Sequence, residues 1–239
     1  MTAFLPLWNK FEQSLLDEYE CWHTFEHVPE RVSVPGFLSA RRYVRGEGTE
    51  RVFFTLYEIE SLQTLETNAY KELVNEPSDW SARMRQYFND FRRYPCEMVA
   101  SGGRGIAGKA ATLILPLEGS PDDAEKLVEP LREQLQRGAV TAFRLGLSIP
   151  NPQYKVFDQK IAGDDVRAVA IVVVEATTGQ QLNGALRDLA EPISSLASET
   201  STEWEVFDLL YVMSRENLPQ RTGWRTLPRD DLRVLFLRD

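Results

Sequence analysis

The feature that most constrains the fold is an order of predicted elements that occurs twice along the chain. In the first half, hydrophobic patterns predict strands over residues 3–8, 37–44, 51–59 and 96–100, and helices over 11–28, 62–74 and 80–94. In the second half they predict strands over 111–117, 140–149, 166–176 and 204–212, and helices over 121–137 and 180–195. Both halves follow the order β-α-β-β-α-β, which is that of a ferredoxin-like unit with an antiparallel sheet. We therefore predict an α+β fold made of two diverged ferredoxin-like units.

The boundary between the two units falls in a glycine-rich segment. It contains a literal G-x-G-x-x-G, from Gly103 through Gly105 to Gly108. A dinucleotide-binding loop of this pattern needs a helix after it, because the helix N-terminus holds the pyrophosphate. A strand pattern follows here, so we interpret the segment as a connector and expect no cofactor. We predict units at residues 1–103 and 109–239, the second with a C-terminal tail, joined in one barrel-like body.

Composition argues against several functional classes. The net charge of −9 disfavours nucleic acid as a partner, since phosphates require a basic face. No apolar run approaches the roughly 20 residues that span a membrane, and the N-terminus does not have the pattern of a signal peptide. The two cysteines, Cys21 and Cys96, have no metal-like spacing and indicate reduced thiols. We expect a cytoplasmic protein that binds a small-molecule substrate, without nucleic acid or membrane partners, and leave a homodimer open.

Both histidines of the chain lie within the segment Trp22-His23-Thr24-Phe25-Glu26-His27. On a helix, His23 and His27 are four residues apart and Glu26 is three from His23, so the three side chains share one flank. Histidine changes charge near neutral pH, and a nearby carboxylate fixes its tautomer and raises its basicity. This grouping predicts acid–base chemistry in a metal-free pocket.

Two other interpretations of the segment stay open. Its letters also match H-x-x-E-H, the inverted zincin pattern, in which two helical histidines and a distant carboxylate hold zinc. Against zinc, Pro29 interrupts the helix soon afterwards and nothing singles out a third ligand. In the third interpretation a histidine at a helix end bonds to a strand, and Glu26 is a surface charge.

A longer motif in the first half resembles the dimeric α+β barrel superfamily, and within it EthD-like and related bacterial proteins. The residues that carry the resemblance are Trp22-x-x-x-Glu26-His27-x-Pro29-Glu30-Arg31, Pro35-Gly36-Phe37, Arg41-Arg42-Tyr43, Leu56-Tyr57-Glu58 and Tyr70. The match covers residues 1–100, and the second half fits by its order of elements. Members include cofactor-independent monooxygenases, isomerases, lyases and cyclases that act on small aromatic or lactone compounds, beside haem-using and non-catalytic relatives.

The resemblance implies a site in a cleft between the sheet and the helices. The family histidine corresponds to His27, whereas His23 occupies a position that more often holds an aromatic residue. We expect His27 as general acid or base, with His23 or Glu26 as its orienting partner. The expected substrate contacts are Trp8, Asn9, Trp22, Arg41, Tyr43 and Tyr57. The resulting hypotheses are a cofactor-independent lyase, isomerase or monooxygenase, a non-catalytic small-molecule-binding or stress-associated protein, and a metal-dependent hydrolase or lyase.

Overall fold

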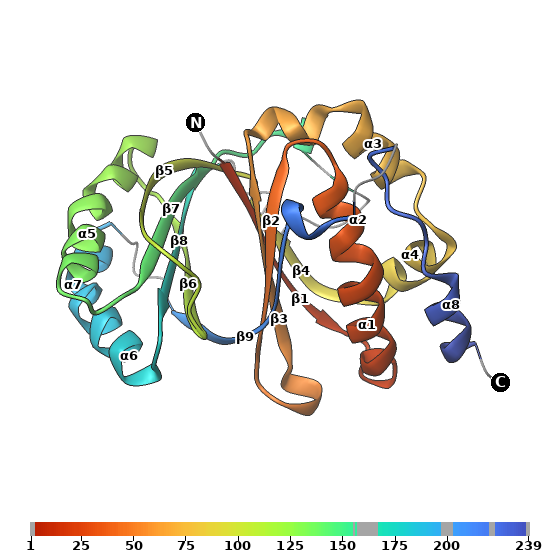
Figure 1. The fold of residues 1–239 in the computed structure, drawn as a ribbon. Helices are drawn as coiled ribbons and strands as arrows, with labels where there is room; N and C mark the ends of the chain where they lie inside the picture. The colour runs from red at the N-terminus through yellow and green to blue at the C-terminus, as the bar shows by residue number, and fades with distance from the viewer. Residues whose placement is uncertain (1–2, 155, 157–166, 197–202, 220–222, 238–239) are drawn as a thin grey trace.

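The fold is a barrel of antiparallel strands with helices packed on two opposite sides (Figure 1). In the computed structural model, residues 3–154, 156, 167–196, 203–219 and 223–237 are described. Within these residues, nine strands form one sheet in the order β3-β2-β9-β6-β8-β7-β5-β1-β4, and a further pairing of β1 with β3 closes it. Eight strands therefore make the barrel, and β4 extends it beside β1.

The first half supplies five strands and four short α-helices. Its strands are β1 (Ala3–Phe11), β2 (Phe37–Arg45), β3 (Val52–Ile59), β4 (Phe88–Arg93) and β5 (Cys96–Gly103). Its helices are α1 (Leu16–Trp22), α2 (Val28–Ser33), α3 (Asn68–Asn75) and α4 (Asp79–Met84), with a π-helical turn at His23–His27 between α1 and α2. The strands lie in the order β2-β3-β1-β5, which is the ferredoxin-like arrangement.

The second half repeats this arrangement. Its strands are β6 (Lys109–Pro116), β7 (Ala142–Ser148), β8 (Val169–Ala176) and β9 (Glu205–Ser214). Its helices are α5 (Val128–Gln136), α6 (Gly179–Asp188) and α7 (Ala190–Ser194). The strand order β7-β8-β6-β9 is the same as in the first half. The predicted duplicated α+β fold is thus confirmed, whereas the division at residues 103 and 109 stays a prediction.

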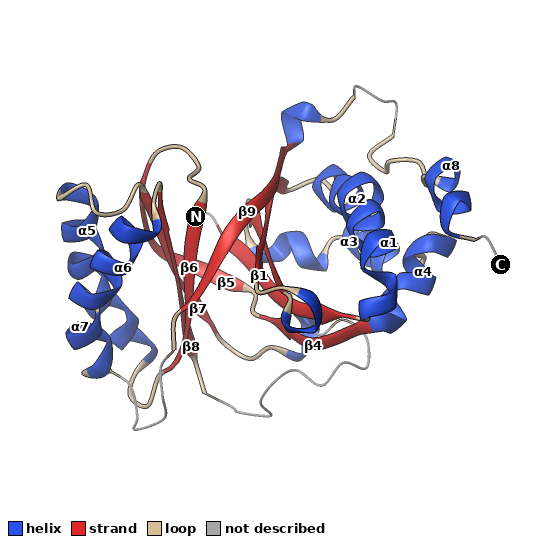
Figure 2. Ribbon diagram, turned by 90° about the horizontal axis from the view of Figure 1, so that it is seen from below, coloured by secondary structure: helices blue, strands red, loops and turns tan. Residues whose placement is uncertain are grey.

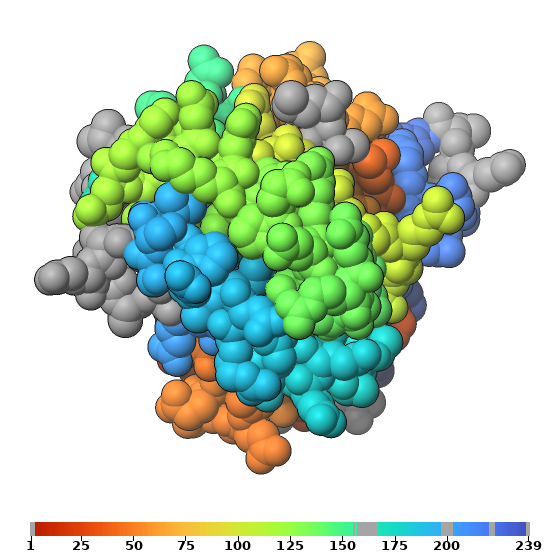
Figure 3. Space-filling view, turned by 90° about the vertical axis from the view of Figure 1, so that its left-hand side faces the viewer, coloured from red at the N-terminus to blue at the C-terminus, as the bar shows by residue number. Residues whose placement is uncertain are grey.

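Two joins between the halves close the barrel. β2 pairs with β9, and β5 pairs with β7, so each half contributes the same two edge strands of its ferredoxin-like sheet. In Figure 2, β9 crosses the barrel from the second half towards the first. From the side shown in Figure 3, helices of the second half cover the sheet. The barrel is therefore completed within one chain.

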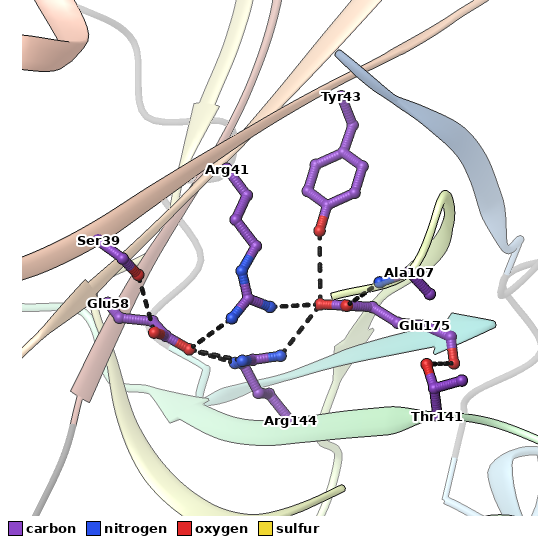
Figure 4. A network of polar contacts seen from close by, with 8 residues as sticks. All are labelled: Ser39, Arg41, Tyr43, Glu58, Ala107, Thr141, Arg144 and Glu175. Atoms are coloured by element: carbon purple, nitrogen blue, oxygen red, sulfur yellow. Dashed lines mark hydrogen bonds and ion pairs between the residues drawn. The ribbon is translucent and has the colours of Figure 1, made fainter. Parts of the chain in front are cut away.

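The interior of the barrel holds a buried network of charges that the two halves share (Figure 4). Arg41 of β2 and Arg144 of β7 both bond to Glu58 of β3 and to Glu175 of β8. Arg41 lies opposite Leu56 of β3, two residues before Glu58 on that strand. In the same way, Arg144 lies opposite Val173 of β8, two residues before Glu175. The four charges are therefore two copies of one arginine–glutamate pair.

Strand pleating sends neighbouring residues of β1 to opposite sides of the sheet. The indole nitrogen of Trp8 donates to Thr112 Oγ1 at 3.1 Å in the barrel interior, and the Trp8 ring stacks on Phe54 at 4.9 Å. Asn9 faces the helices and bonds to the hydroxyl of Tyr19 in α1. The outer face of the first half thus packs against its helices, while the inner face packs across the barrel.

Two predicted helices differ from the structure, which also places the C-terminal tail. The helix predicted over 80–94 is wrong in its last part. α4 ends at Met84 and a 3-10 turn ends at Tyr87, after which Phe88–Arg93 forms β4 and pairs with β1. The helix predicted over 11–28 begins only at Leu16, because Phe11 still belongs to β1. The tail, which the sequence left unplaced, returns to the first half and forms α8 (Asp230–Arg233) beside α1.

Candidate functional site

A narrow cavity lies between the outer face of the first-half sheet and its helices. Its volume is about 50 Å³, or about 600 Å³ with the solvent-open mouth included. The lining residues come from β1, β3 and β4, the π-helical turn, α2, α3, the residue after α4 and one loop residue: Leu5, Leu7, Asn9, His23, His27, Arg31, Thr55, Tyr57, Tyr70, Val74, Arg85, Phe88, Phe91, Arg93 and Val156. We call this space the sheet–helix cavity. Four predicted site residues, His23, His27, Asn9 and Tyr57, line it.

The two histidines occupy the first and last positions of the π-helical turn. Such turns occur inside α-helices mostly as single insertions and are frequent at functional sites. The two imidazole centroids are 4.9 Å apart, and the Trp22 ring lies 4.5 Å from that of His27. Burial, and then the charge of Arg31 for His27 and of Arg42 for His23, lowers both pKa values well below 6.5. Both imidazoles are therefore neutral at pH 7.

Five buried polar atoms around this cavity have no hydrogen-bond partner within the described part of the protein. They are His23 Nδ1, His27 Nδ1, Arg31 Nη1, Thr55 Oγ1 and the Tyr57 hydroxyl. Buried polar side-chain atoms are normally bonded, and an exception calls for an explanation. Here all five belong to residues that line one cavity, so they provide both donors and acceptors for a bound polar molecule.

The other predicted residues lie elsewhere. Glu26 accepts hydrogen bonds from Ser78 Oγ at 2.6 Å and from the backbone N–H of Arg229 at 2.7 Å, so it ties α4 and the tail to the π-helical turn. Trp22 packs beneath His27 and donates to Ser81. The last three residues, Trp8, Arg41 and Tyr43, face the barrel interior.

The sequence did not single out several lining residues as site candidates. Thr55, Arg85 and Arg93 carried no motif signal, while Arg31 and Tyr70 belong to the resemblance but were not assigned a role. The alternation along β3 could have added Thr55 to Tyr57, since residues two apart share a face. Arg93 could not be placed, because it reaches the cavity only through the pairing of β4 with β1.

A second cavity opens at the mouth of the barrel. It has a volume of about 410 Å³ and is lined by Arg41, Glu58 and Arg144 together with the glycine-rich segment around Gly103 and Gly105. It is larger than the sheet–helix cavity. Its charged side chains, however, already bond to one another, so it offers few unsatisfied groups to a ligand.

The histidine pair is poorly suited to a metal ion. Across the described ranges, no group of three or more His, Cys, Asp or Glu side chains is arranged to hold one. The Arg31 and Arg42 guanidiniums act on the imidazoles and disfavour a nearby cation. A zinc site needs three or four protein ligands, and here only two histidines come together. Stoichiometric metal in elemental analysis of the purified protein would contradict this conclusion.

Comparison with known proteins bears on the fold. No protein-family model matches the sequence, and no curated protein matches it either. Among solved structures, an anthrone oxidase-like protein superposes with a TM-score of 0.61 at 10% identity, covering 90% of this chain and 93% of its own. A protein from Fusobacterium nucleatum subsp. nucleatum, provisionally classed as a monooxygenase, gives 0.57 at 8% identity over 89% and 94% of the chains. One from Lactobacillus acidophilus, classed likewise, gives 0.52 at 11% over 90% and 96%.

The chain has the dimeric α+β barrel fold. In this chain the two ferredoxin-like halves of the barrel belong to one polypeptide, as the joins β2–β9 and β5–β7 show. In the described part of the chain, no helix has both the length and the hydropathy for a membrane span.

Some dimeric α+β barrel proteins use haem, as the resemblance implied. A porphyrin is many times larger than the enclosed part of the sheet–helix cavity, which is about 50 Å³. It therefore does not fit between these residues as they stand.

Proposed function

We propose that the chain is a cofactor-independent enzyme that moves a proton on a small oxygenated or aromatic molecule bound in the sheet–helix cavity. The observation that carries this proposal is the convergence of five unpartnered buried polar atoms on that one cavity. Leaving such groups unsatisfied costs about 1–3 kcal/mol each. A ligand that bonds to them would recover part of that cost.

His27 is the proposed proton acceptor. Its lowered pKa keeps the ring neutral at pH 7, so a ring nitrogen is free to take a proton from an acidic O–H, or from a C–H beside a carbonyl. The electron pair left behind forms an oxyanion. Arg31 Nη1 and the Tyr57 hydroxyl, both buried donors without partners among the described residues, would stabilise that charge as preorganised donors. His23, which packs against His27, is the proposed orienting partner.

We propose a first step that several enzyme classes share, and then one of those classes. Proton abstraction to give an enolate or phenolate is common to isomerases, lyases and cofactor-independent monooxygenases. The fold is shared with an anthrone oxidase-like protein and with proteins provisionally classed as monooxygenases, which supports the third of these. In that case dioxygen would react with the anion of a CH2 group beside the carbonyl: that carbon becomes C=O with one oxygen atom, and its two hydrogens leave with the other oxygen atom as water. We also propose a cytoplasmic location and leave a homodimer open.

The His27→Asn variant provides the test. A panel of hydroxyaromatic and 1,3-dicarbonyl compounds would be screened for substrate depletion and oxygen uptake. General acid–base catalysis contributes about 10²- to 10⁴-fold, so kcat/KM of His27→Asn should fall by that factor on any substrate found. Gln134→Leu is the matched control, because Gln134 is buried in the helical layer of the second half and also has an unpartnered oxygen. A His27→Asn enzyme with full activity would remove the assignment.

A second candidate is a protein that binds a small molecule in this cavity without converting it. The observation in its favour is the pKa of both histidines, which lies well below 6.5, whereas an efficient general base has a pKa near the operating pH. For a binding protein, a ligand would raise the melting temperature and no member of the panel would be turned over.

A further inference from the structure

Glu26 is a buried carboxylate within the π-helical turn, outside the lining of the sheet–helix cavity. It is 2% exposed. Its Oε1 accepts hydrogen bonds from Ser78 Oγ at 2.6 Å and from Ser81 Oγ at 3.4 Å, both at α4. Its Oε2 accepts one from the backbone N–H of Arg229 at 2.7 Å, where the tail enters α8. A buried carboxylate is costly unless it is hydrogen-bonded, so these bonds hold Glu26 between α4 and the tail.

The backbone gives the first route from Glu26 to the site. Glu26 immediately precedes His27 in the turn His23–His27. The peptide bond between them is planar and stiff, so a carboxylate fixed to α4 and to the tail restricts where His27 can lie. The turn carries the two imidazoles at its ends, and its placement therefore decides how both rings face the cavity.

The Trp22 side chain gives the second route. Its indole nitrogen donates to Ser81 Oγ at 3.1 Å, and the same hydroxyl donates to Glu26. A serine hydroxyl has one donor and two lone pairs, so the bond to Glu26 turns the lone pairs of Ser81 towards Trp22. The fully buried Trp22 ring lies 4.5 Å from the His27 ring. Glu26 thereby also holds the surface on which His27 packs.

Packing, more than hydrogen bonding, keeps the imidazole of His27 in place. Its Nδ1 has no partner in the described part of the chain, whereas site histidines are often oriented by a bond to one ring nitrogen. The ring instead lies between those of Trp22 and His23, at centroid distances of 4.5 and 4.9 Å. Its direction therefore depends on whatever fixes the turn and the indole, and Glu26 contacts both.

We propose that Glu26 is a positioning residue: anchored to α4 and to the C-terminal tail, it holds the π-helical turn and the Trp22 ring so that His27 faces the sheet–helix cavity. The consequence for activity rests on the proposed function of His27. The placement of the ring stands on the contacts alone.

Nuclear magnetic resonance of protein with carbon-13-labelled histidine tests this placement, because the chain has two histidines. The wild-type protein should give two sets of ring signals, which His23→Gln assigns. Glu26→Ala should shift and broaden the His27 signal, since the ring then samples more than one position. Glu26→Gln keeps an oxygen for the Arg229 N–H and an amine that can donate to Ser78. It should restore most of the wild-type signal.

The matched control is Glu18→Ala. Glu18 is another buried glutamate of the same helical layer, 3% exposed. It ties α1 to α4 by accepting from Trp80 Nε1 at 2.8 Å and by pairing with Arg83, and it lies outside the π-helical turn. Glu18→Ala should lower the melting temperature about as much as Glu26→Ala does, and should leave the His27 signal at its wild-type position. A purely structural role for Glu26 predicts the same signals in both variants.

A second pair of variants tests the tail and leaves Glu26 unchanged. Arg229→Pro removes the backbone N–H that Glu26 accepts, because proline has none. Arg229→Ala removes the side chain and its pair with Asp231 and keeps that N–H. We expect the His27 signal to shift in Arg229→Pro and to stay in Arg229→Ala. Equal shifts in the two would overturn the part assigned to the tail. This pair decides the question also if Glu26→Ala does not fold.

Activity gives an independent measurement once a substrate is found. A misplacement of about 1 Å can cost about 100-fold in rate, so kcat of Glu26→Ala should fall by up to about that factor. KM should change little, because the lost interaction acts through His27 on the reacting step. Glu26→Gln should recover most of kcat, and Glu18→Ala should keep it.

The possible results separate this inference from the proposed function. A His27 signal that is unchanged in Glu26→Ala and Arg229→Pro, or that shifts equally in Glu18→Ala, would overturn the inference. If the signal shifts as expected and His27→Asn keeps full activity, Glu26 positions the ring and the proposed function fails. If His27→Asn loses activity while Glu26→Ala keeps both the wild-type signal and the wild-type kcat, the proposed function stands and the inference fails.

Discussion

The layer between sheet and helices is polar and hollow in the first half, and apolar and closely packed in the second. The strand registers allow the two halves to be aligned residue by residue. Glu58 lies opposite Phe4 in the first half, and its equivalent Glu175 lies opposite Ala110 in the second, so Phe4 corresponds to Ala110. Three equivalent pairs then differ in polarity: Asn9 and Leu115, Thr55 and Val172, Tyr57 and Val174. On the helix side, the second half presents Leu127, Leu131 and Leu182 to this layer, where the first half has its histidines and Arg31.

The difference shows how a duplicated fold can separate stability from function. Both helical layers are needed to cover the barrel, yet among the described residues it is the first layer that gathers several unsatisfied buried polar groups around a cavity, whereas the second has the single oxygen of Gln134. The second layer has a large apolar core, in which each fully buried side chain contributes about 1.5–3 kcal/mol. Functional sites commonly reduce stability in this way, and here the second half would compensate for the first.

The largest expected effect concerns the charge network that both halves share. Glu175 is fully buried, whereas the side chain of its equivalent, Glu58, is 28% exposed. Removing one member of a buried ion pair costs about 3–5 kcal/mol, so Glu175→Gln should lower the free energy of unfolding by that amount. Glu58→Gln should cost less, because water can partly solvate the arginines it leaves. Urea unfolding measures both, with the surface variant Glu129→Gln as control. Equal losses for the two variants would show that the network does not distinguish the halves.

Much of the fold could be predicted from the sequence. The β-α-β-β-α-β order follows from local hydrophobic patterns, and the antiparallel barrel follows from that order repeated. The segment 88–93 could not be predicted, because its two phenylalanines at spacing three also suit a helix. Pairing with β1 makes it a strand, and Asp90 takes a positive φ of 47° there. Tertiary pairing of this kind overrides local preference.

The site was predictable only where it depends on local spacing. His23 and His27 come together because they are four residues apart in a helical segment, and the structure adds that the turn is π-helical. Trp8 and Asn9 are adjacent and therefore face opposite ways, but the sequence does not tell which of them faces the helices. The arginines that line the cavity come from three separate elements, and no local pattern contains that information.

The second-largest expected effect is the pH dependence of stability, which should arise from titrating groups of the first half alone. Both histidines lie there, and burial lowers both pKa values in the folded state. Below about pH 6.5 the unfolded chain binds protons that the folded protein does not, so stability is full above that pH and falls as pH decreases. Between pH 6.5 and 5.5 the two groups together should cost about 2 kcal/mol.

Urea unfolding at a series of pH values measures this slope. A double variant, His23→Gln with His27→Gln, should lose most of it. Carboxylates titrate at lower pH, and Arg144 and Arg41 hold the pKa of Glu58 below its usual value despite burial, so their contribution falls in a separate range. A slope that persists in the double variant would place the titrating groups outside the cavity.

The smallest effect is a matched exchange between two equivalent positions. Thr55 Oγ1 is buried without a partner in the described part of the protein, and Val172 holds the same place in the packed layer of the second half. Thr55→Val removes an unsatisfied hydroxyl at nearly constant volume and should stabilise the protein by about 1 kcal/mol. Val172→Thr creates such a hydroxyl and should destabilise it by about 1–3 kcal/mol. Thermal unfolding of both variants measures the signs, and ligand affinity should fall only in Thr55→Val. If both exchanges destabilise alike, the Thr55 hydroxyl is satisfied in solution, and the two layers differ less than their residues imply.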